Sequence, residues 1–311
     1  MILNYKKLLV AFVFVAAGYA HAQIRISARV ELKAYLPYEP IMLTINLENN
    51  SGNTLVFPKV EKPDLKDAHK PLPDFIRCDV SDEQNSLMPE TAYAKRMFGE
   101  GHVNFGSELI LPSGGNRKLT VQLNQFYRMT RHQKYTIKVM VRHHRLPVDF
   151  VSEELTISVV PGVTKLTQYV GVPSKFGEEN KEIKQRKCEL ISFHGDVNTE
   201  YVLRVSDDTY VYCTQRLSKH ISGDLPDLQV DARSQIHIII QVEAKTFKYW
   251  LFDIGGDLKQ TSLYRYDKRV GVPKLSRDPD IGRVMVFGGV RYVPEEDEEL
   301  ELPTYNGGNE L

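Results

Sequence analysis

The sequence predicts an all-β protein in which an N-terminal β-sandwich is followed by a second antiparallel β domain. Apolar and polar residues alternate with a period of two in both halves of the chain, which is typical of strands with one buried face. Clusters of glycine, proline and asparagine separate these segments at short intervals. The 311-residue chain is longer than a common single domain, so we expect two domains.

The first residues have the pattern of a secretory signal peptide. Lys6 and Lys7 precede an apolar run over residues 8–17, and small residues follow at 20–22. This order of segments predicts that residues 1–22 are removed. The apolar run is shorter than the roughly 20 residues that a membrane span requires. We therefore expect a protein secreted to the periplasm or to the cell exterior, with no membrane span after cleavage.

The charge of the chain is balanced. It carries 40 basic and 40 acidic side chains, which argues against nucleic acid as a partner. The exception is the segment 295–311, which is strongly acidic. Such a segment cannot bury enough apolar surface to offset its ordering entropy, so we expect an acidic, disordered tail.

The first domain is predicted over residues 23–161 from about seven short strands. Clear alternation occurs at residues 24–33, 41–47, 109–111, 119–123, 135–141 and 155–159. The segment 58–106 between them has several prolines and little periodicity. It is either an ordered excursion with a binding role or a pair of edge strands, and the second interpretation is preferred, with one strand near residues 75–80.

Three motifs in this half, YEPIMLTINLENNSG, LPSGG and YTIKVMV, give it a resemblance to a known family. It resembles a bacterial immunoglobulin-like domain of the kind that includes the BsuPI-type proteinase inhibitors. The resemblance covers residues 23–161 and implies an Ig-like β-sandwich. Such domains often carry a glycine just before the last tyrosine strand, whereas Gln133 and Lys134 precede Tyr135 here. The resemblance therefore implies the fold and not inhibitor activity.

The second half is predicted as a linker over residues 162–187 and a β domain over residues 188–294. Its central strand covers residues 236–242, and Ile239 on the otherwise polar side indicates that both faces are partly covered. Two further strands flank the turn at 253–257, whose glycines supply the positive φ of a tight hairpin. This half resembles propeller-blade material, but it is too short for a propeller, so a sandwich or an open barrel is expected.

The three cysteines leave two alternatives open. Cys188 and Cys213 form a disulfide in an oxidising compartment, or both are small buried hydrophobes like Cys78.

No catalytic or cofactor motif is present, and no cofactor or metal is predicted. The sequence has no Gly-x-Ser-x-Gly, His-Glu-x-x-His, phosphate-loop or dinucleotide pattern. His143 and His144 are adjacent, so on a strand they point to opposite faces and cannot chelate one metal unless the backbone turns there. No cysteine or carboxylate at a metal-ligand spacing completes a set with them.

Aromatic residues and one histidine are the candidate binding residues. Tyr264 and Tyr266 share a face of one predicted strand, Trp250 lies on the preceding strand, and His237 lies in the central strand. Such side chains stack on sugar rings or hold an apolar anchor of a partner. The alternative for the aromatic residues is packing in the core or at its rim, and for His237 it is a hydrogen-bonded core or interface histidine.

The sequence does not identify a biochemical activity. The expected function is an exported, non-enzymatic binding module for an unknown protein or glycan partner. A secreted hydrolase acting on glycans requires converging carboxylates, and an inhibitor of secreted proteases requires a protruding loop, for which only residues 58–106 qualify. A polar pocket that joins imidazole, carboxylate and hydroxyl groups would argue against the non-enzymatic interpretation.

Overall fold

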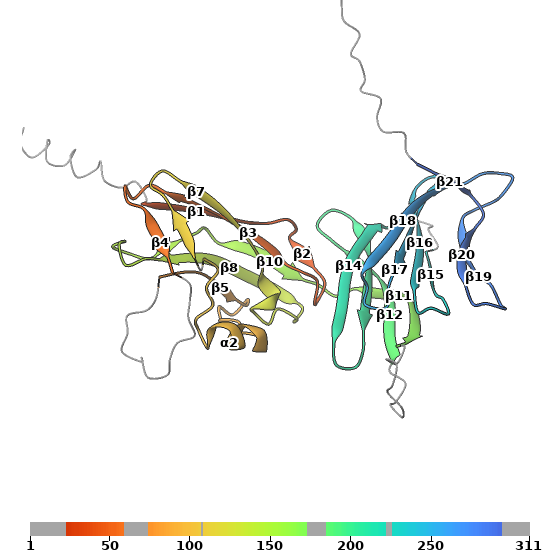
Figure 1. Cartoon of the computed structure of the whole chain (residues 1–311), viewed down its shortest axis with the longest axis horizontal. Coiled ribbons are helices and arrows are strands. Elements are labelled where there is room, and N and C mark those ends of the chain that lie inside the picture. The colour runs from red at the N-terminus through yellow and green to blue at the C-terminus, as the bar shows by residue number, and fades with distance from the viewer. Residues whose placement is uncertain (1–22, 59–73, 107, 173–184, 222–225, 294–311) are drawn as a thin grey trace, which may run out of the picture. The chain divides into compact units, whose positions relative to one another are not determined.

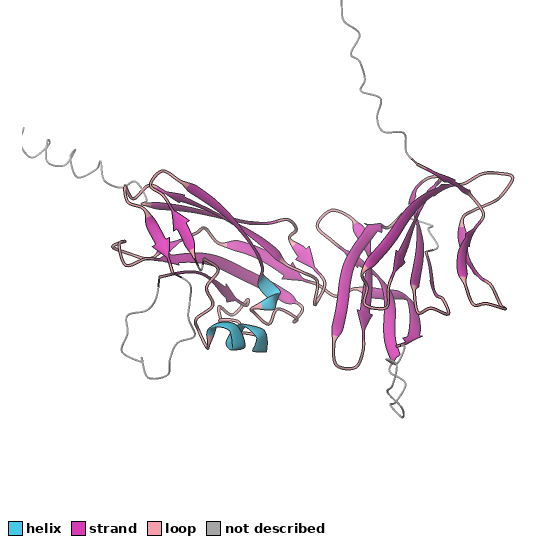
Figure 2. Cartoon of the chain, in the orientation of Figure 1, coloured by secondary structure: helices cyan, strands magenta, loops and turns pink. Residues whose placement is uncertain are grey.

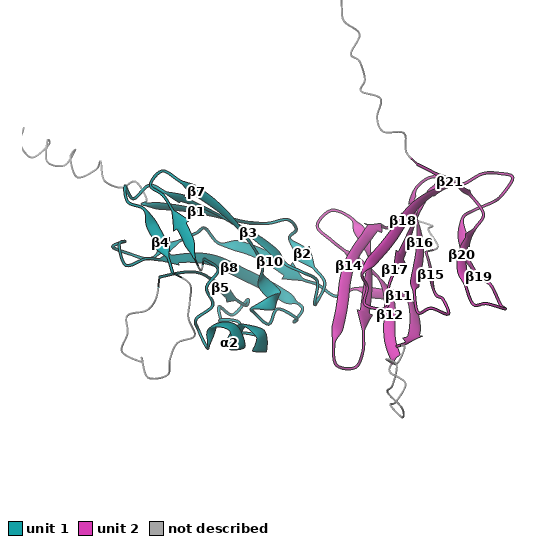
Figure 3. Ribbon diagram, viewed as in Figure 1, with its two compact units in different colours: residues 1–161 teal, residues 162–311 magenta. Residues whose placement is uncertain are grey.

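The computed structural model describes residues 23–58, 74–106, 108–172, 185–221 and 226–293 (Figure 1). The regular secondary structure of the described residues is almost entirely β-strand, which confirms the predicted all-β fold class (Figure 2). It forms two compact units, Met1–Pro161 and Gly162–Leu311 (Figure 3). The predicted signal peptide and acidic tail lie outside the described residues.

The first unit contains two main antiparallel sheets and a small one. The first sheet has the order β1-β3-β7, the second has the order β2-β10-β8-β5 with β9 beside β8, and β4 pairs with β6. Among the described strands of this unit, only β2 and β10 pair in parallel. The strands are β1 (Ile24–Val30), β2 (Ala34–Tyr35), β3 (Met42–Asn49), β4 (Leu55–Phe57), β5 (Phe75–Ser81), β6 (Leu109–Leu111), β7 (Asn116–Gln122), β8 (Gln133–Arg142), β9 (Phe150–Val151) and β10 (Leu155–Val159).

One hydrophobic core joins the sheets of this unit. Alternate residues of β3 and β8 are almost fully buried, as their period-two patterns predict. Side chains of both strands belong to the same cluster, including Leu43, Ile45, Ile137 and Val139. The arrangement is a sandwich-like packing of β-sheets, in agreement with the predicted architecture.

The segment 58–106 contains one predicted strand and one helix that was not predicted. The strand β5 forms the edge of its sheet, next to β8. The helix α2 (Ala92–Phe98) begins after Thr91, whose hydroxyl accepts a hydrogen bond from the backbone N–H of Ala94. Ala94 is fully buried in the core of the unit. Residues 59–73 of this segment lie outside the described part.

The second unit is a sandwich with an additional hairpin. Its first sheet has the order β11-β12-β13-β14, its second has the order β15-β16-β17-β18-β21, and β19 pairs with β20. All these pairs are antiparallel. The strands are β11 (Val163–Gly171), β12 (Gln185–His194), β13 (Thr199–Ser206), β14 (Val211–Lys219), β15 (Asp227–Val230), β16 (Ile236–Glu243), β17 (Thr246–Phe252), β18 (Leu258–Arg265), β19 (Lys274–Arg277), β20 (Val284–Phe287) and β21 (Val290–Tyr292).

The predicted linker over residues 162–187 is wrong where it is described. Residues 163–171 form β11, an edge strand that pairs with β12 along its length. Its side chains are mostly exposed, and Val170 is its only buried residue. A strand with so few buried side chains lacks a clear apolar alternation, which explains why the sequence pattern resembled a linker. Residues 173–184 of the predicted linker lie outside the described part.

The second sheet of this unit is covered on both faces. One face carries Ile236, Ile238, Trp250 and other residues that pack against the first sheet. The opposite face carries a smaller cluster with Ile239 and Tyr249, covered by side chains of the β19–β20 hairpin. The prediction that both faces of the central strand are partly covered is therefore confirmed.

Candidate functional site

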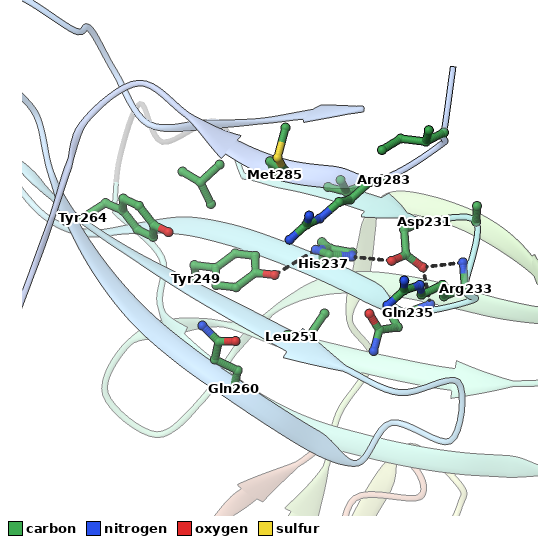
Figure 4. Close-up of a pocket in the computed structure, with 14 residues that line it drawn as sticks. Asp231, Arg233, Gln235, His237, Tyr249, Leu251, Gln260, Tyr264, Arg283 and Met285 are labelled. Atoms are coloured by element: carbon green, nitrogen blue, oxygen red, sulfur yellow. Dashed lines mark hydrogen bonds and ion pairs between the residues drawn. The ribbon is translucent and has the colours of Figure 1, made fainter. Parts of the chain in front are cut away.

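A cavity lies between the second sheet and the β19–β20 hairpin, and we call it the hairpin cavity. Its volume is about 560 Å³. Figure 4 shows side chains from the sheet and from the hairpin side pointing into the same space. Polar groups in its lining come from Asp231, Arg233, Gln235, His237, Tyr249, Gln260 and Arg283. Apolar groups come from Leu251, Tyr264, Ile281, Val284, Met285 and Val286.

Hydrogen bonds from β15 and from the turn after it hold the hairpin over the sheet. The Asp227 carboxylate accepts a bond of 3.2 Å from the backbone N–H of Leu275 in β19. The backbone N–H of Ala232 donates to the Gly282 carbonyl at 3.0 Å, which joins the turn after β15 to the loop before β20. The hairpin is therefore attached both at β19 and at the loop before β20, and the space beneath it is a defined cavity.

The turn after β15 positions a buried carboxylate beside the cavity. One oxygen of Asp231 accepts hydrogen bonds from the backbone N–H groups of Arg233, at 2.9 Å, and Gln235, at 2.8 Å. The carboxylate thus closes its own turn, as aspartate side chains commonly do. Its second oxygen lies 3.4 Å from Nε2 of His237.

His237 connects this carboxylate to a tyrosine hydroxyl. Its Nδ1 lies 2.8 Å from the hydroxyl oxygen of Tyr249, and Figure 4 shows the three groups in a row. A carboxylate oxygen only accepts, so the proton of the neutral imidazole lies on Nε2, facing Asp231. The Tyr249 hydroxyl then donates to Nδ1.

Burial controls the protonation of both residues. His237 is 4 % exposed, and burial lowers its pKa below the ordinary value although Asp231 opposes this shift. Burial also raises the pKa of Tyr249 to about 12, and the guanidinium of Arg283 opposes that shift. At neutral pH the imidazole of His237 is therefore neutral and the phenol of Tyr249 is protonated.

The row has the residue types of a nucleophile, a base and an orienting carboxylate, but the phenol is poorly suited to be the nucleophile. A base-activated nucleophile acts as the deprotonated species, and a raised pKa makes the phenolate scarce. Asp231 is also the only carboxylate among the described residues that line the cavity. Glycosidases use two carboxyl groups, so the arrangement does not fit that reaction. It is better suited to hold a ligand through hydrogen bonds.

The structure brings two of the four predicted binding residues to this cavity. His237 and Tyr264 line it, and the Tyr264 ring packs edge-on against Tyr249. Trp250 points to the opposite face, where it is 4 % exposed within the core between the two sheets. Tyr266 follows β18 and does not line the cavity. We therefore leave Trp250 and Tyr266 out of the candidate site.

The sequence analysis missed Asp231, Tyr249 and Arg283. Alternation places Tyr249 and Trp250 on opposite faces of β17, but it does not say which face opens to a cavity. The spacing of Asp231 and His237 around one turn was available as a signal, because an aspartate that closes a turn lies near the strand that follows. Arg283 carried no local signal, since it approaches through the β19–β20 hairpin.

A second polar cluster lies in the first unit and corrects the expectation for His143 and His144. The backbone turns after β8, so the two imidazole rings stack with their centroids 4.5 Å apart. Asp74, far away in the sequence, lies 2.6 Å from Nδ1 of His144 and 3.4 Å from Nε2 of His143. These three side chains are close enough to share a metal ion.

The hydrogen bonds of His143 oppose metal binding at this cluster. Its Nδ1 accepts from the backbone N–H of Arg145 at 3.1 Å, which places the proton on Nε2. Nε2 then donates toward the Val56 carbonyl at 3.2 Å and has no lone pair for a metal. The cluster is satisfied by its own hydrogen bonds and ties β4 and β8 to the residue before β5.

The disulfide expected as one alternative does not form. All three cysteines are free thiols. Cys188 and Cys213 lie on β12 and β14, each paired with Val205 of the strand between them. Two strand spacings separate them by about 10 Å, whereas a disulfide requires Cα atoms within about 7 Å. Burial raises the pKa of Cys188 to about 12, so this thiol stays protonated.

Comparison with known proteins gives no assignment. No protein-family model, no curated protein and no solved structure matches the chain. Within the described residues, no helix has both the length and the apolar character needed to cross a bilayer.

Proposed function

We propose that this is an exported binding protein whose second domain holds a small ligand, or one unit of a larger ligand, in the hairpin cavity. The observation that carries the proposal is the cavity itself, in which convergent polar groups lie beside apolar side chains. Its volume of about 560 Å³ falls within the range of about 300–1,000 Å³ that is common for ligand sites. The signal-peptide pattern of residues 1–22 supports export.

The test is to fill the cavity and measure ligand binding. Leu251→Trp adds a large side chain to the floor of the cavity. Leu258→Trp makes the same change at a residue of β18 that is 46 % exposed and does not line the cavity. A library of sugars and small metabolites is screened by ligand-observed NMR. We expect binding to the wild type and to Leu258→Trp, and loss of binding to Leu251→Trp.

Thermal unfolding of both variants serves as the control for folding. Hits that bind the filled variant as well as the wild type would move the site away from this cavity. A wild-type protein without any hit would count against the proposed function.

A second candidate function is hydrolysis, and the row of Asp231, His237 and Tyr249 is the observation that favours it. The row joins a carboxylate, an imidazole and a hydroxyl group beside a cavity. Fluorogenic esters and glycosides are the appropriate substrates. Turnover that is lost in both His237→Gln and Tyr249→Phe would establish catalysis, and we expect no turnover above background, because the phenol is rarely ionised at neutral pH.

A further inference from the structure

Two arginines place positive charge at the hairpin cavity. Arg233 lies in the turn after β15, and Arg283 lies just before β20. Both are exposed and line the cavity. Among the described residues neither guanidinium group has an ion pair or a side-chain hydrogen bond.

The only carboxylate of the lining does not neutralise these cations. Asp231 is 8 % exposed. Its oxygens already face two backbone N–H groups and the imidazole of His237. A ligand that enters the cavity therefore meets two exposed cations and one buried, occupied anion. The electrostatic preference of the site is for negative charge.

Arg283 is directed toward the polar centre of the cavity. Figure 4 shows its side chain reaching over the row of His237 and Tyr249. Its positive charge acts on the Tyr249 hydroxyl, because it opposes the rise of that group's pKa. A guanidinium group has a planar fork of donors that matches the two oxygens of a carboxylate.

Apolar side chains also line the cavity, beside the amide of Gln260. Leu251 and Val286 line it together with the ring of Tyr264, which Figure 4 places at the other end of the cavity from Asp231. A bare inorganic anion would make no apolar contact with these side chains. A ligand with one acidic group and an apolar or ring-shaped body would use both parts of the lining.

We propose that the hairpin cavity binds an organic acid, with its carboxylate at the guanidinium of Arg283 and its body against Tyr264 and Leu251. The inference rests on the proposed binding function and specifies its ligand class. Arg233 adds a second positive charge at the mouth of the cavity. The acid is either an aliphatic or alicyclic carboxylic acid or a sugar acid, since both present a carboxylate on a body of suitable size.

The experiment compares matched acidic and neutral ligands on the full chain. The probes are cyclohexanecarboxylate with cyclohexanecarboxamide, glucuronate with glucose, and inorganic phosphate, measured by titration calorimetry. We expect one acid of the two pairs to bind at least about tenfold more tightly than its neutral partner, because charge-assisted bonds are the stronger ones. The pair that responds identifies the source of the acid.

Arginine variants assign the contact. Arg283→Gln is expected to weaken binding of the acid by about tenfold or more and to leave the neutral partner unchanged. Arg269→Gln is the control, because it removes the same charge from a side chain that is 90 % exposed and does not line the cavity. Binding of the acid to this control should equal binding to the wild type.

Three results would overturn the inference. They are equal binding of acid and neutral partner in both pairs, unchanged binding of the preferred acid to Arg283→Gln, and binding of phosphate without either acid. If the cavity binds only neutral ligands and Leu251→Trp abolishes that binding, the proposed function stands and the acidic ligand class falls. If the acids bind Leu251→Trp as tightly as they bind the wild type, the hairpin cavity is not the binding site, and both the proposed function and the acidic ligand class are refuted.

Discussion

Replacing Tyr249 by phenylalanine tests the polar row most directly, because it removes one oxygen atom and leaves the ring in place. The hydroxyl is 2.8 Å from Nδ1 of His237. Tyr249 is 8 % exposed and His237 is 4 % exposed, so the bond lies in a largely buried environment. The substitution leaves the imidazole nitrogen without its donor and does not create a cavity in the core.

The expected cost follows from the hydrogen bond alone. An intramolecular hydrogen bond contributes about 0.5–1.5 kcal/mol, and an unsatisfied buried partner raises the loss to about 1–3 kcal/mol. Because the hairpin cavity adjoins Nδ1, water can replace part of the bond, so we expect the free energy of unfolding to fall by about 1 kcal/mol.

Tryptophan fluorescence during urea unfolding measures this change in the second domain alone. Trp250 is the only tryptophan of the chain and lies in the core of that domain. Tyr264→Phe is the control, since no hydrogen bond to its hydroxyl is present among the described residues, and a change within about 0.5 kcal/mol is expected. A loss below about 0.3 kcal/mol for Tyr249→Phe, at an unchanged m-value, would refute the bond to His237.

Three further predictions concern the core, the pH dependence and the first unit. Trp250→Ala should lower the free energy of unfolding by about 3–5 kcal/mol, whereas Tyr266→Ala should change it by less than about 0.5 kcal/mol; circular dichroism during urea unfolding checks both. The pKa of His237 is lowered by burial, so its contribution to stability is complete above the unfolded pKa of about 6.5 and is lost as the pH falls toward the folded pKa. The midpoint of urea unfolding of the second domain should therefore fall between pH 7.5 and 5.5, and His237→Gln should flatten that fall. Asp74→Ala should lower the stability of the first unit by about 1–3 kcal/mol, because it removes the carboxylate that accepts from the backbone N–H of His144; thermal unfolding followed by circular dichroism measures it, and an unchanged midpoint would contradict the role of the cluster.

The sequence pattern predicted the strands that have one buried face and one solvent-exposed face. The alternation at residues 41–47 and 135–141 follows from local pleating, and the structure places those apolar side chains in the core of the first unit. β11 was missed because its side chains are mostly exposed, and α2 because it has only seven residues and depends on the cap at Thr91. Neither element carries the periodic signal on which the prediction relied.

The hairpin cavity was predictable only in part, because it depends on contacts between distant segments. His237 and Tyr264 carried a visible signal as a histidine and an aromatic residue on predicted strands. The partnership of His237 with Tyr249 depends on the pairing of β16 with β17, and the approach of Arg283 depends on where the β19–β20 hairpin folds back. The alternation of apolar and polar residues does not predict these contacts between distant segments.

The free thiols determine how folding and unfolding of the chain depend on oxidising conditions. No covalent cross-link ties its strands together, so folding requires no oxidant, and the chain should reach the same structure in the cytosol of an expression host as in an oxidising compartment. Cys78 and Cys188 are shielded from alkylating reagents only while the strands around them stay closed. Denaturation in air would release reactive sulfur, join chains to one another and make the loss of structure irreversible, whereas a reductant in the buffer would keep it reversible.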